Sequence, residues 1–189
     1  LTDTDNARIY LRSVFKPLKG LEIVGEYTYD RKNDQQSLYA NKWAYTSEDF
    51  GTLYSTDHDY YYKKENHTDY NALNLYATYN LTLKEDHNFK IMAGFNQERK
   101  QTSSLSAYSY DQIAPSAPTV GGNIGQLTAS NSFSDYAIRG GFFRFNYNYM
   151  DKYLLEVNGR YDGSSKFPKD DRFGFFPSLS AGWNIAKES

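Results

Sequence analysis

The stretch Tyr153–Ile185, YLLEVNGRYDGSSKFPKDDRFGFFPSLSAGWNI, alternates residue types with a period of two on both sides of a polar middle. Near its end, one set of alternate positions is mainly apolar and the other is small and polar: Leu179, Ala181, Trp183 and Ile185 against Ser178, Ser180, Gly182 and Asn184. Successive side chains of a β-strand point to opposite faces, whereas a helix would scatter these two sets. The stretch therefore predicts two strands joined by a polar loop.

The same alternation recurs upstream of this stretch and predicts seven strands in all. They cover Ala7–Phe15, Leu21–Asp30, Asn71–Leu83, Phe89–Glu98, Phe142–Met150, Tyr153–Tyr161 and Phe176–Ile185. A strand that crosses a bilayer at a tilt needs roughly 9 to 11 residues. The predicted strands have lengths close to this requirement.

The predicted connections between strands alternate in length. Short turns are expected at Lys16–Gly20, Lys84–Asn88 and Met150–Lys152, and long polar connections at Arg31–Thr68, Thr102–Asp135 and Gly163–Gly174. Structureless loops this long are uncommon in a compact soluble domain. Outer-membrane barrels, in contrast, have short periplasmic turns and long extracellular loops.

The composition agrees with a protein whose strands cross a membrane, and it argues against transmembrane helices, cysteine chemistry and nucleic-acid binding. Aromatic residues make up 17% of the chain, including 19 tyrosines, although the mean hydropathy is -0.77. Tyrosine concentrates where a surface is apolar on one side and wet on the other. No window of 18 apolar residues could form a transmembrane helix, and the absence of cysteine excludes disulfides and thiolate chemistry. A net charge of -2 gives no reason to expect nucleic acid as a partner.

The competing interpretation is a soluble or surface β-sandwich, such as a carbohydrate-binding module with aromatic loops. In a sandwich, alternation means that one face covers a core and the other faces water. Its core face should be rich in Val, Ile and Leu at mid-strand. Here that face carries Leu, Ala, Gly and Phe, with Tyr or Trp toward the strand ends, as an aromatic girdle would. The pattern favours a barrel and leaves the module as the alternative.

The segment Tyr149–Glu188 closely resembles the signature stretch of SusC/RagA-type TonB-dependent transporters of the Bacteroidetes. The motif falls on Arg160, Asp162, Gly163, Ser164, Ser165, Phe167, Phe176, Pro177, Ser178, Ala181, Gly182, Trp183 and Glu188. Pro17–Asp30, Leu81–Glu98 and Arg139–Leu155 resemble the same family more loosely, so the resemblance covers the strands of nearly the whole chain.

The resemblance implies an all-β fold, an antiparallel transmembrane β-barrel segment of seven strands from a plugged barrel of the 22-stranded class. Residues 1–189 are then part of a single barrel domain. We expect the plug domain and the remaining strands to lie outside this chain.

The function that the resemblance implies is TonB-driven import of oligosaccharides or peptides across the bacterial outer membrane. The implied partners are a SusD-like surface lipoprotein, TonB through the plug region, the solute and outer-membrane lipid, with no cofactor and no enzymatic activity. This chain would form barrel wall and extracellular loops. The polar positions expected to face the lumen are Arg144, Asn146, Asn148, Glu156, Asn158 and Arg160.

A few other residues suggest additional chemistry. His58 and His67 could bind a metal, but their spacing matches no known ligand motif, and a solvated loop is the preferred interpretation. Thr2–Asn6 resembles the start of a calcium loop but lacks its glycine and distal glutamate. Tyr60–Tyr62 could stack on sugar rings, although packing within a long loop is favoured. The sequence contains no recognisable arrangement of nucleophile, base and orienting group.

Overall fold

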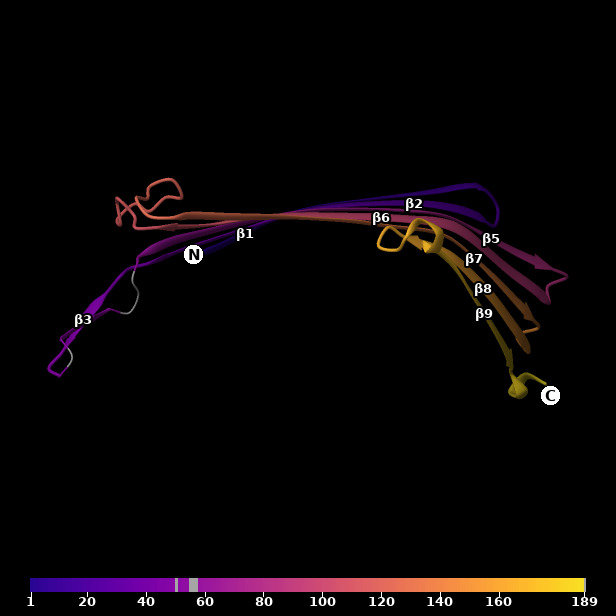
Figure 1. Cartoon of the computed structure of the whole chain (residues 1–189). Helices are drawn as coiled ribbons and strands as arrows, with labels where there is room; N and C mark the ends of the chain where they lie inside the picture. Colours follow the sequence, from indigo (N-terminus) through magenta and orange to yellow (C-terminus); the bar gives the residue numbers. More distant parts are fainter. Residues whose placement is uncertain (50, 55–57, 189) are drawn as a thin grey trace. The chain divides into compact units, whose positions relative to one another are not determined.

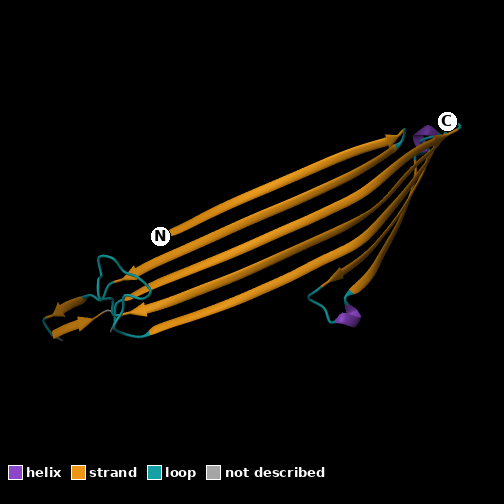
Figure 2. Cartoon of the chain, turned by 90° about the horizontal axis from the view of Figure 1, so that it is seen from above, coloured by secondary structure: helices purple, strands orange, loops and turns teal. Residues whose placement is uncertain are grey.

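The computed structural model describes residues 1–49, 51–54 and 58–188, and its main element is one seven-stranded sheet. The strand order is β1-β2-β5-β6-β7-β8-β9, and neighbouring strands run in opposite directions (Figures 1 and 2). Their bounds are β1 Thr2–Leu18, β2 Leu21–Ala40, β5 Tyr60–Leu83, β6 His87–Tyr110, β7 Leu127–Tyr149, β8 Tyr153–Ser164 and β9 Phe173–Trp183. A separate hairpin pairs β3, Ala44–Ser47, with β4, Gly51–Tyr54. The prediction of seven antiparallel strands is confirmed.

The chain divides into two compact units, each of which contains parts of several strands. Unit 1 comprises Leu1–Ala7, Arg31–Asp69 and Gln101–Ser134. Unit 2 comprises Arg8–Asp30, Tyr70–Lys100 and Asp135–Ser189. Two short 3-10 helices, η1 Lys169–Asp171 and η2 Ile185–Lys187, belong to unit 2.

The three short turns lie where the sequence predicts them, between β1 and β2, β5 and β6, and β7 and β8. Gly20 in the first turn has φ 87°. The other two contain consecutive residues with positive φ: Lys84 and Glu85 at 50° and 63°, and Met150 and Asp151 at 52° and 56°. Two successive positive φ angles are typical of the tight turns whose twist matches that of antiparallel strands. The turn geometry thus fixes the register of each hairpin.

The long connections are shorter than predicted, because the strands continue into them. Strands β5 and β6 have 24 residues each, and β2 extends to Ala40. The connection predicted at Thr102–Asp135 contains the end of β6 and the start of β7. The one predicted at Arg31–Thr68 contains the hairpin β3–β4, and includes residues 55–57, which lie outside the described residues.

The extensions of β2 and β5, residues 31–37 and 63–69, are almost entirely polar, so hydropathy carries no period there. The extensions of β6 and β7 do alternate, since Ser or Thr separates the apolar residues at 105 and 107 and at 127 and 129, and this signal was missed. Backbone pairing and cross-strand polar contacts hold them together instead. The hydroxyls of Thr68 and Thr102, for example, lie 3.3 Å apart across β5 and β6.

In unit 2 the register of the strands aligns an apolar and a polar face. Phe145 pairs with Val157, which pairs with Leu179, while the adjacent row joins Asn146, Glu156 and Ser180. The ring of Phe89 stacks on Tyr147 at 4.9 Å on the apolar face. Side chains of each kind therefore form continuous rows across the strands.

The apolar face is not covered by a second sheet among the described residues. Leu179 is 73% exposed and Trp183 is 58% exposed, and the only buried hydrophobic residues in the described part of the chain are Val24 and Ala107. A sandwich would bury such a face in a core between two sheets. The sandwich alternative is therefore wrong for this sheet.

Gly94 in β6 allows a close approach of the neighbouring strands. A Cβ atom at this position would lie 2.8 Å from the carbonyl oxygen of Leu75 and 2.7 Å from Cβ of Tyr76. It would also lie 2.5 Å from the ring of Phe142. Gly141 has more room, since its nearest atom would be the carbonyl oxygen of Gly94 at 3.8 Å.

We predict that Gly94→Ala destabilises the full-length protein by about 1 to 3 kcal/mol, because backbone atoms must shift to make room for the methyl group. Gly141→Ala is the matched control and should change stability by less than about 1 kcal/mol in either direction. The free energy of unfolding, measured by urea titration in detergent, checks this expectation. Equal losses for the two variants would contradict the proposed crowding at Gly94.

Candidate functional site

A hydrogen-bonded polar ladder lies on β7 and β8 of unit 2. Nε of Arg144 donates to Oδ1 of Asn158 at 2.8 Å, and Nδ2 of Asn146 donates to Oε2 of Glu156 at 2.5 Å. Nδ2 of Asn158 also donates to Oε1 of Glu156 at 2.7 Å. Four side chains from two strands thus form one connected network, which holds them in fixed positions on the sheet.

The ladder extends onto β9, and a separate ion pair lies farther along β8. Nδ2 of Asn158 lies 3.4 Å from Oγ of Ser178. Arg160 forms a two-point contact with Asp162, at 2.9 and 3.0 Å, and its guanidinium lies 5.3 Å from the ring centroid of Phe142. A depression of about 360 Å³ is lined by Arg144, Asn158, Arg160 and Ser178, among others. This surface can donate hydrogen bonds to a polar solute.

The structure brings the six predicted lumen residues onto one face of β7 and β8. Arg144, Asn146 and Asn148 pair in register with Asn158, Glu156 and Leu154. Asn148 contacts the turn, where its Nδ2 donates to Oδ1 of Asp151 at 2.5 Å. That this face lines a lumen stays a prediction.

Sequence reasoning missed a row of ion pairs between β1 and β2. Arg8 pairs with Asp30 at 2.5 Å, Arg12 with Glu26 at 3.2 Å, and Lys16 with Glu22 at 3.0 Å. The signal was available, because three cations recur every four residues in β1 and three acids recur every four residues in β2. Exposed pairs of this kind add little stability individually, but together they give the face a regular charged pattern.

Several signature residues have structural roles at the β8–β9 connection. A Cβ on Gly163 would clash with the ring of Phe173, so the ring lies over this glycine. Oγ of Ser165 accepts a hydrogen bond from the backbone N–H of Ala137 at 2.9 Å, which ties the loop to β7. The carbonyl of Phe167 accepts from Nε of Arg172 at 3.1 Å, which closes the loop on itself.

The remaining signature residues align β9 with β8. Phe176 pairs with Arg160, Pro177 with Gly159, and Ser178 with Asn158. Further along, Ala181 and Gly182 pair with Leu155 and Leu154, and Nε1 of Trp183 donates to Glu188 at 3.3 Å. These residues set strand register and the end of β9.

Unit 1 contains a cluster of four tyrosines, Tyr60, Tyr62, Tyr108 and Tyr110, which we call the tyrosine cluster. The ring centroids of Tyr62 and Tyr108 are 4.5 Å apart, and those of Tyr60 and Tyr108 are 5.9 Å apart. Tyr108 is 40% exposed. The two Tyr-x-Tyr patterns, at residues 60–62 and 108–110, are a signal for the cluster, but both lie in segments predicted to be loops, whereas the structure places them in β5 and β6.

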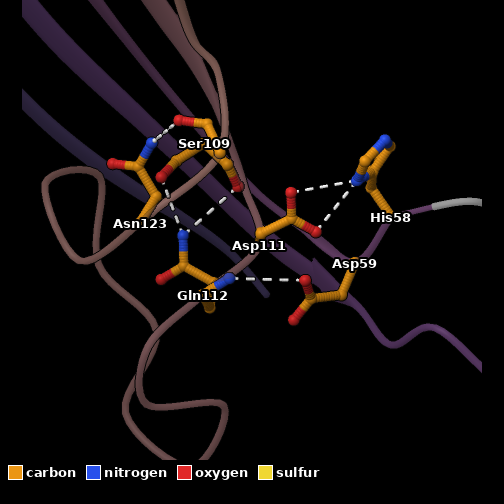
Figure 3. A network of polar contacts seen from close by, with 7 residues as sticks. His58, Asp59, Ser109, Asp111, Gln112 and Asn123 are labelled. Carbon is orange, nitrogen blue, oxygen red and sulfur yellow. Dashed lines mark hydrogen bonds and ion pairs between the residues drawn. The ribbon is translucent and has the colours of Figure 1, made fainter.

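A polar network joins the start of β5 to the segment after β6 (Figure 3). Nδ1 of His58 lies 2.9 Å from both carboxylate oxygens of Asp111, and the backbone N–H of Gln112 donates to Asp59 at 3.3 Å. Nε2 of Gln112, which is buried, donates to Oγ of Ser109 at 2.7 Å. The network fixes the base of the connection at residues 111–126 beside the tyrosine cluster.

Tyr39 extends this network to β2. Its hydroxyl donates to Oδ2 of Asp59 at 2.5 Å, and this hydrogen bond, together with desolvation, raises the pKa of Tyr39 to about 12. The donated hydrogen bond ties β2 to the network at Asp59.

The other two positions considered for metals also have local partners. His67 lies with Nδ1 2.5 Å from Oδ1 of Asn33 and Nε2 2.7 Å from Asp69. Residues Thr2–Asn6 form part of β1 rather than a calcium-binding loop. The described residues contain no group of three His, Cys, Asp or Glu side chains that could hold a metal ion. No helix in the described part of the chain is long and apolar enough to cross a membrane.

Comparison with known proteins extends over the whole chain. Residues 2–188 match the family model described as TonB dependent receptor-like, beta-barrel. TonB-dependent receptor P3 of Formosa agariphila is 26% identical over 189 residues, which cover 99% of this chain and 18% of the relative. TonB-dependent receptor SusC of Bacteroides thetaiotaomicron is 50% identical over 48 residues, which cover 25% of this chain and 5% of that protein. The chain therefore spans less than a fifth of the length of these relatives.

A solved structure with the same fold supports the match. The RagAB peptide importer in the 'open-open' state aligns with a TM-score of 0.85 and 19% identity over 99% of this chain and 20% of that one. The antiparallel sheet thus matches part of a larger barrel, as the signature stretch predicts. By its fold and by a family match over residues 2–188, this chain belongs to the TonB-dependent receptor β-barrel family.

Proposed function

We propose that the protein is an outer-membrane, TonB-dependent importer of oligosaccharides or peptides, and that this chain forms part of its barrel wall and extracellular loops. The observation that carries the proposal is that one face of the sheet is apolar and uncovered among the described residues, while the other is polar and hydrogen-bonded. The fold of RagAB aligns over 99% of this chain. A membrane β-barrel needs this pairing of faces, because one meets lipid and the other meets water.

The proposed orientation follows from the connections. The three turns between β1 and β2, β5 and β6, and β7 and β8 are short, and the opposite strand ends carry the longer connections. Short turns face the periplasm and longer loops face outward in such barrels. The hairpin β3–β4, residues 111–126 and the η1 segment are then extracellular.

Two observations support oligosaccharides or peptides as the substrate class. Tyrosine rings can stack on sugar rings or on aromatic and proline side chains, and the tyrosine cluster offers an exposed ring at Tyr108. The structural relative RagAB is described as a peptide importer. Both solute classes are larger than those that porins pass, and the polar ladder supplies hydrogen-bonding groups for either.

The partners that we propose follow from the same family. A SusD-like surface lipoprotein would cap the barrel from outside, TonB would act through a plug domain, and the apolar face would contact outer-membrane lipid. We propose no enzymatic activity, since the polar ladder contains hydrogen-bonding groups without a paired nucleophile and base. We propose no nucleic-acid binding, since the net charge of the chain is -2.

We predict that deletion of the full-length gene, or of TonB in the same cells, lowers uptake of a labelled oligosaccharide or peptide pool at least about tenfold, because passage of the solute depends on energy transmitted by TonB. Uptake by intact cells, with small sugars and amino acids as controls, provides the measurement. Unchanged uptake of every large solute would contradict the proposed import function.

Cysteine labelling tests the orientation. In the full-length protein, Ser116→Cys and Lys169→Cys should react with a membrane-impermeant maleimide on intact cells, because both lie in connections assigned to the outside. Lys19→Cys and Glu85→Cys, in the short turns, should react only after the outer membrane is permeabilised. Labelling of the second pair on intact cells would reverse the topology.

Arginine substitution tests which face meets lipid. Phe145→Arg should destabilise the barrel by about 2 to 4 kcal/mol, because it places a charge in hydrocarbon near mid-strand. Asn146→Arg, one residue away and on the polar face, should cost less than about 1 kcal/mol, since Glu156 remains available as a partner. Unfolding in lipid vesicles measures both values, and similar costs for the two variants would contradict the assignment of the Phe145 face, rather than the Asn146 face, to lipid.

A further inference from the structure

A pocket of about 530 Å³ opens on unit 2 beside the connection between β8 and β9. Three of its lining side chains are cationic: Arg139, Lys169 and Arg172. The hydroxyl-bearing residues Ser164 and Ser165 also line it, and within the described residues no carboxylate does. The lining therefore combines positive charge with hydrogen-bond donors.

The three cations are not neutralised by acidic partners. Among the described residues, none of them forms an ion pair. Arg139 places its guanidinium 5.5 Å from the ring centroid of Phe173, and Arg172 donates from Nε to the carbonyl of Phe167. Their remaining donors are free to bind an anion.

The nearby carboxylates are engaged elsewhere or lie outside the pocket. Asp162 pairs with Arg160, and Asp135 pairs with Arg99 at 2.6 Å. The exposed η1 residues Asp170 and Asp171 belong to the same connection but do not line the pocket. The excess of positive charge is thus local to the pocket.

The pocket lies at one end of the apolar face. Arg139 pairs with Gly163, which pairs with Phe173, and this row is an even number of residues from the row of Phe145, Val157 and Leu179. Strand alternation therefore places Arg139 and Phe173 on the apolar face. The ring of Phe173 also stacks on Tyr161 at 5.2 Å, so aromatic side chains border the pocket on this face.

The length of β9 places this end of the face near the lipid headgroups. At a rise of about 3.3 Å per residue, the 11 residues from Phe173 to Trp183 cover about 33 Å along the strand. A tilt of about 45° reduces this to about 23 Å across the membrane, close to the height of about 25 Å of the apolar band in such barrels. The pocket is then at the outer headgroup level.

We propose that this pocket binds a phosphate group of an outer-leaflet lipid headgroup. The inference rests on the proposed function, which assigns the apolar face to lipid and the β8–β9 connection to the outside. Arginine binds phosphate oxygens through two parallel hydrogen bonds, and lysine adds a point charge. Basic pockets beside the hydrophobic zone recognise anionic headgroups in this way.

The test uses the full-length protein in detergent. Native mass spectrometry would follow its titration with lipid A, with the same lipid A after phosphatase treatment, and with inorganic phosphate. The wild-type protein should bind intact lipid A at least about tenfold more tightly than the dephosphorylated form. The double variant Arg139→Gln with Lys169→Gln should bind it about 30-fold more weakly, at roughly a tenfold change per 1.4 kcal/mol and about 1 kcal/mol per cation.

A matched control removes the same charge elsewhere. Lys19→Gln with Lys166→Gln alters a distant turn and a lysine whose Nζ lies 4.7 Å from the ring centroid of Tyr136, outside the pocket. This control should bind lipid A within about twofold of wild type. Arg139→Lys keeps the charge but loses the two parallel hydrogen bonds, so it should bind lipid A more tightly than Arg139→Gln and more weakly than wild type. Heat-modifiable migration on a gel verifies that each barrel is folded.

Three outcomes would overturn the proposal: equal binding of intact and dephosphorylated lipid A, unchanged binding by the double variant, or inorganic phosphate that displaces lipid A at equal concentration. The last outcome would indicate a free anion as the ligand. Uptake of large solutes is measured in parallel, in cells that express the same full-length protein. Loss of uptake with retained lipid binding would contradict the import proposal and leave the phosphate site standing.

Discussion

The pairing of backbone N–H and C=O groups between neighbouring strands is the constraint on which the whole structure depends. In hydrocarbon no water can satisfy these groups, and each unpaired group costs several kcal/mol. A strand that crosses a membrane must therefore lie beside another over its full crossing length, which requires tight turns and a fixed register. The consecutive positive φ angles at Lys84–Glu85 and Met150–Asp151 meet the first requirement at two of the hairpins.

Once register is fixed, side-chain chemistry follows from strand alternation. The rows through Phe145 and Asn146 differ by one residue, yet one carries exposed apolar groups and the other a connected polar network. A slip of one residue would exchange the two faces, so both the apolar face and the polar ladder depend on the same pairing. Gly94 allows this pairing where neighbouring strands approach closely, because its position leaves no space for a side chain.

The sequence predicted the existence and order of the seven strands because each has a core of alternating apolar and polar residues. It underestimated their lengths, since the extensions of β2 and β5 are almost entirely polar, and the alternating extensions of β6 and β7 were assigned to loops. Tyr108 and Tyr110 illustrate the consequence: assigned to a loop, they could not be placed opposite Tyr60 and Tyr62. The cross-strand pairs of Arg8, Arg12 and Lys16 were also missed, although the matched spacing of cations in β1 and acids in β2 was a signal for them.

In the signature stretch, the residues that close the β8–β9 connection also border the cationic pocket. Gly163 has no side chain, so the ring of Phe173 can lie over it, and the ring in turn contacts the guanidinium of Arg139. Ser165 holds the connection against β7, which keeps Lys169 and Arg172 on the same pocket. A larger residue at position 163 would displace the ring and remove the support of Arg139. The chemistry that closes the β8–β9 hairpin therefore also sets the geometry of the cationic pocket at the edge of the apolar face.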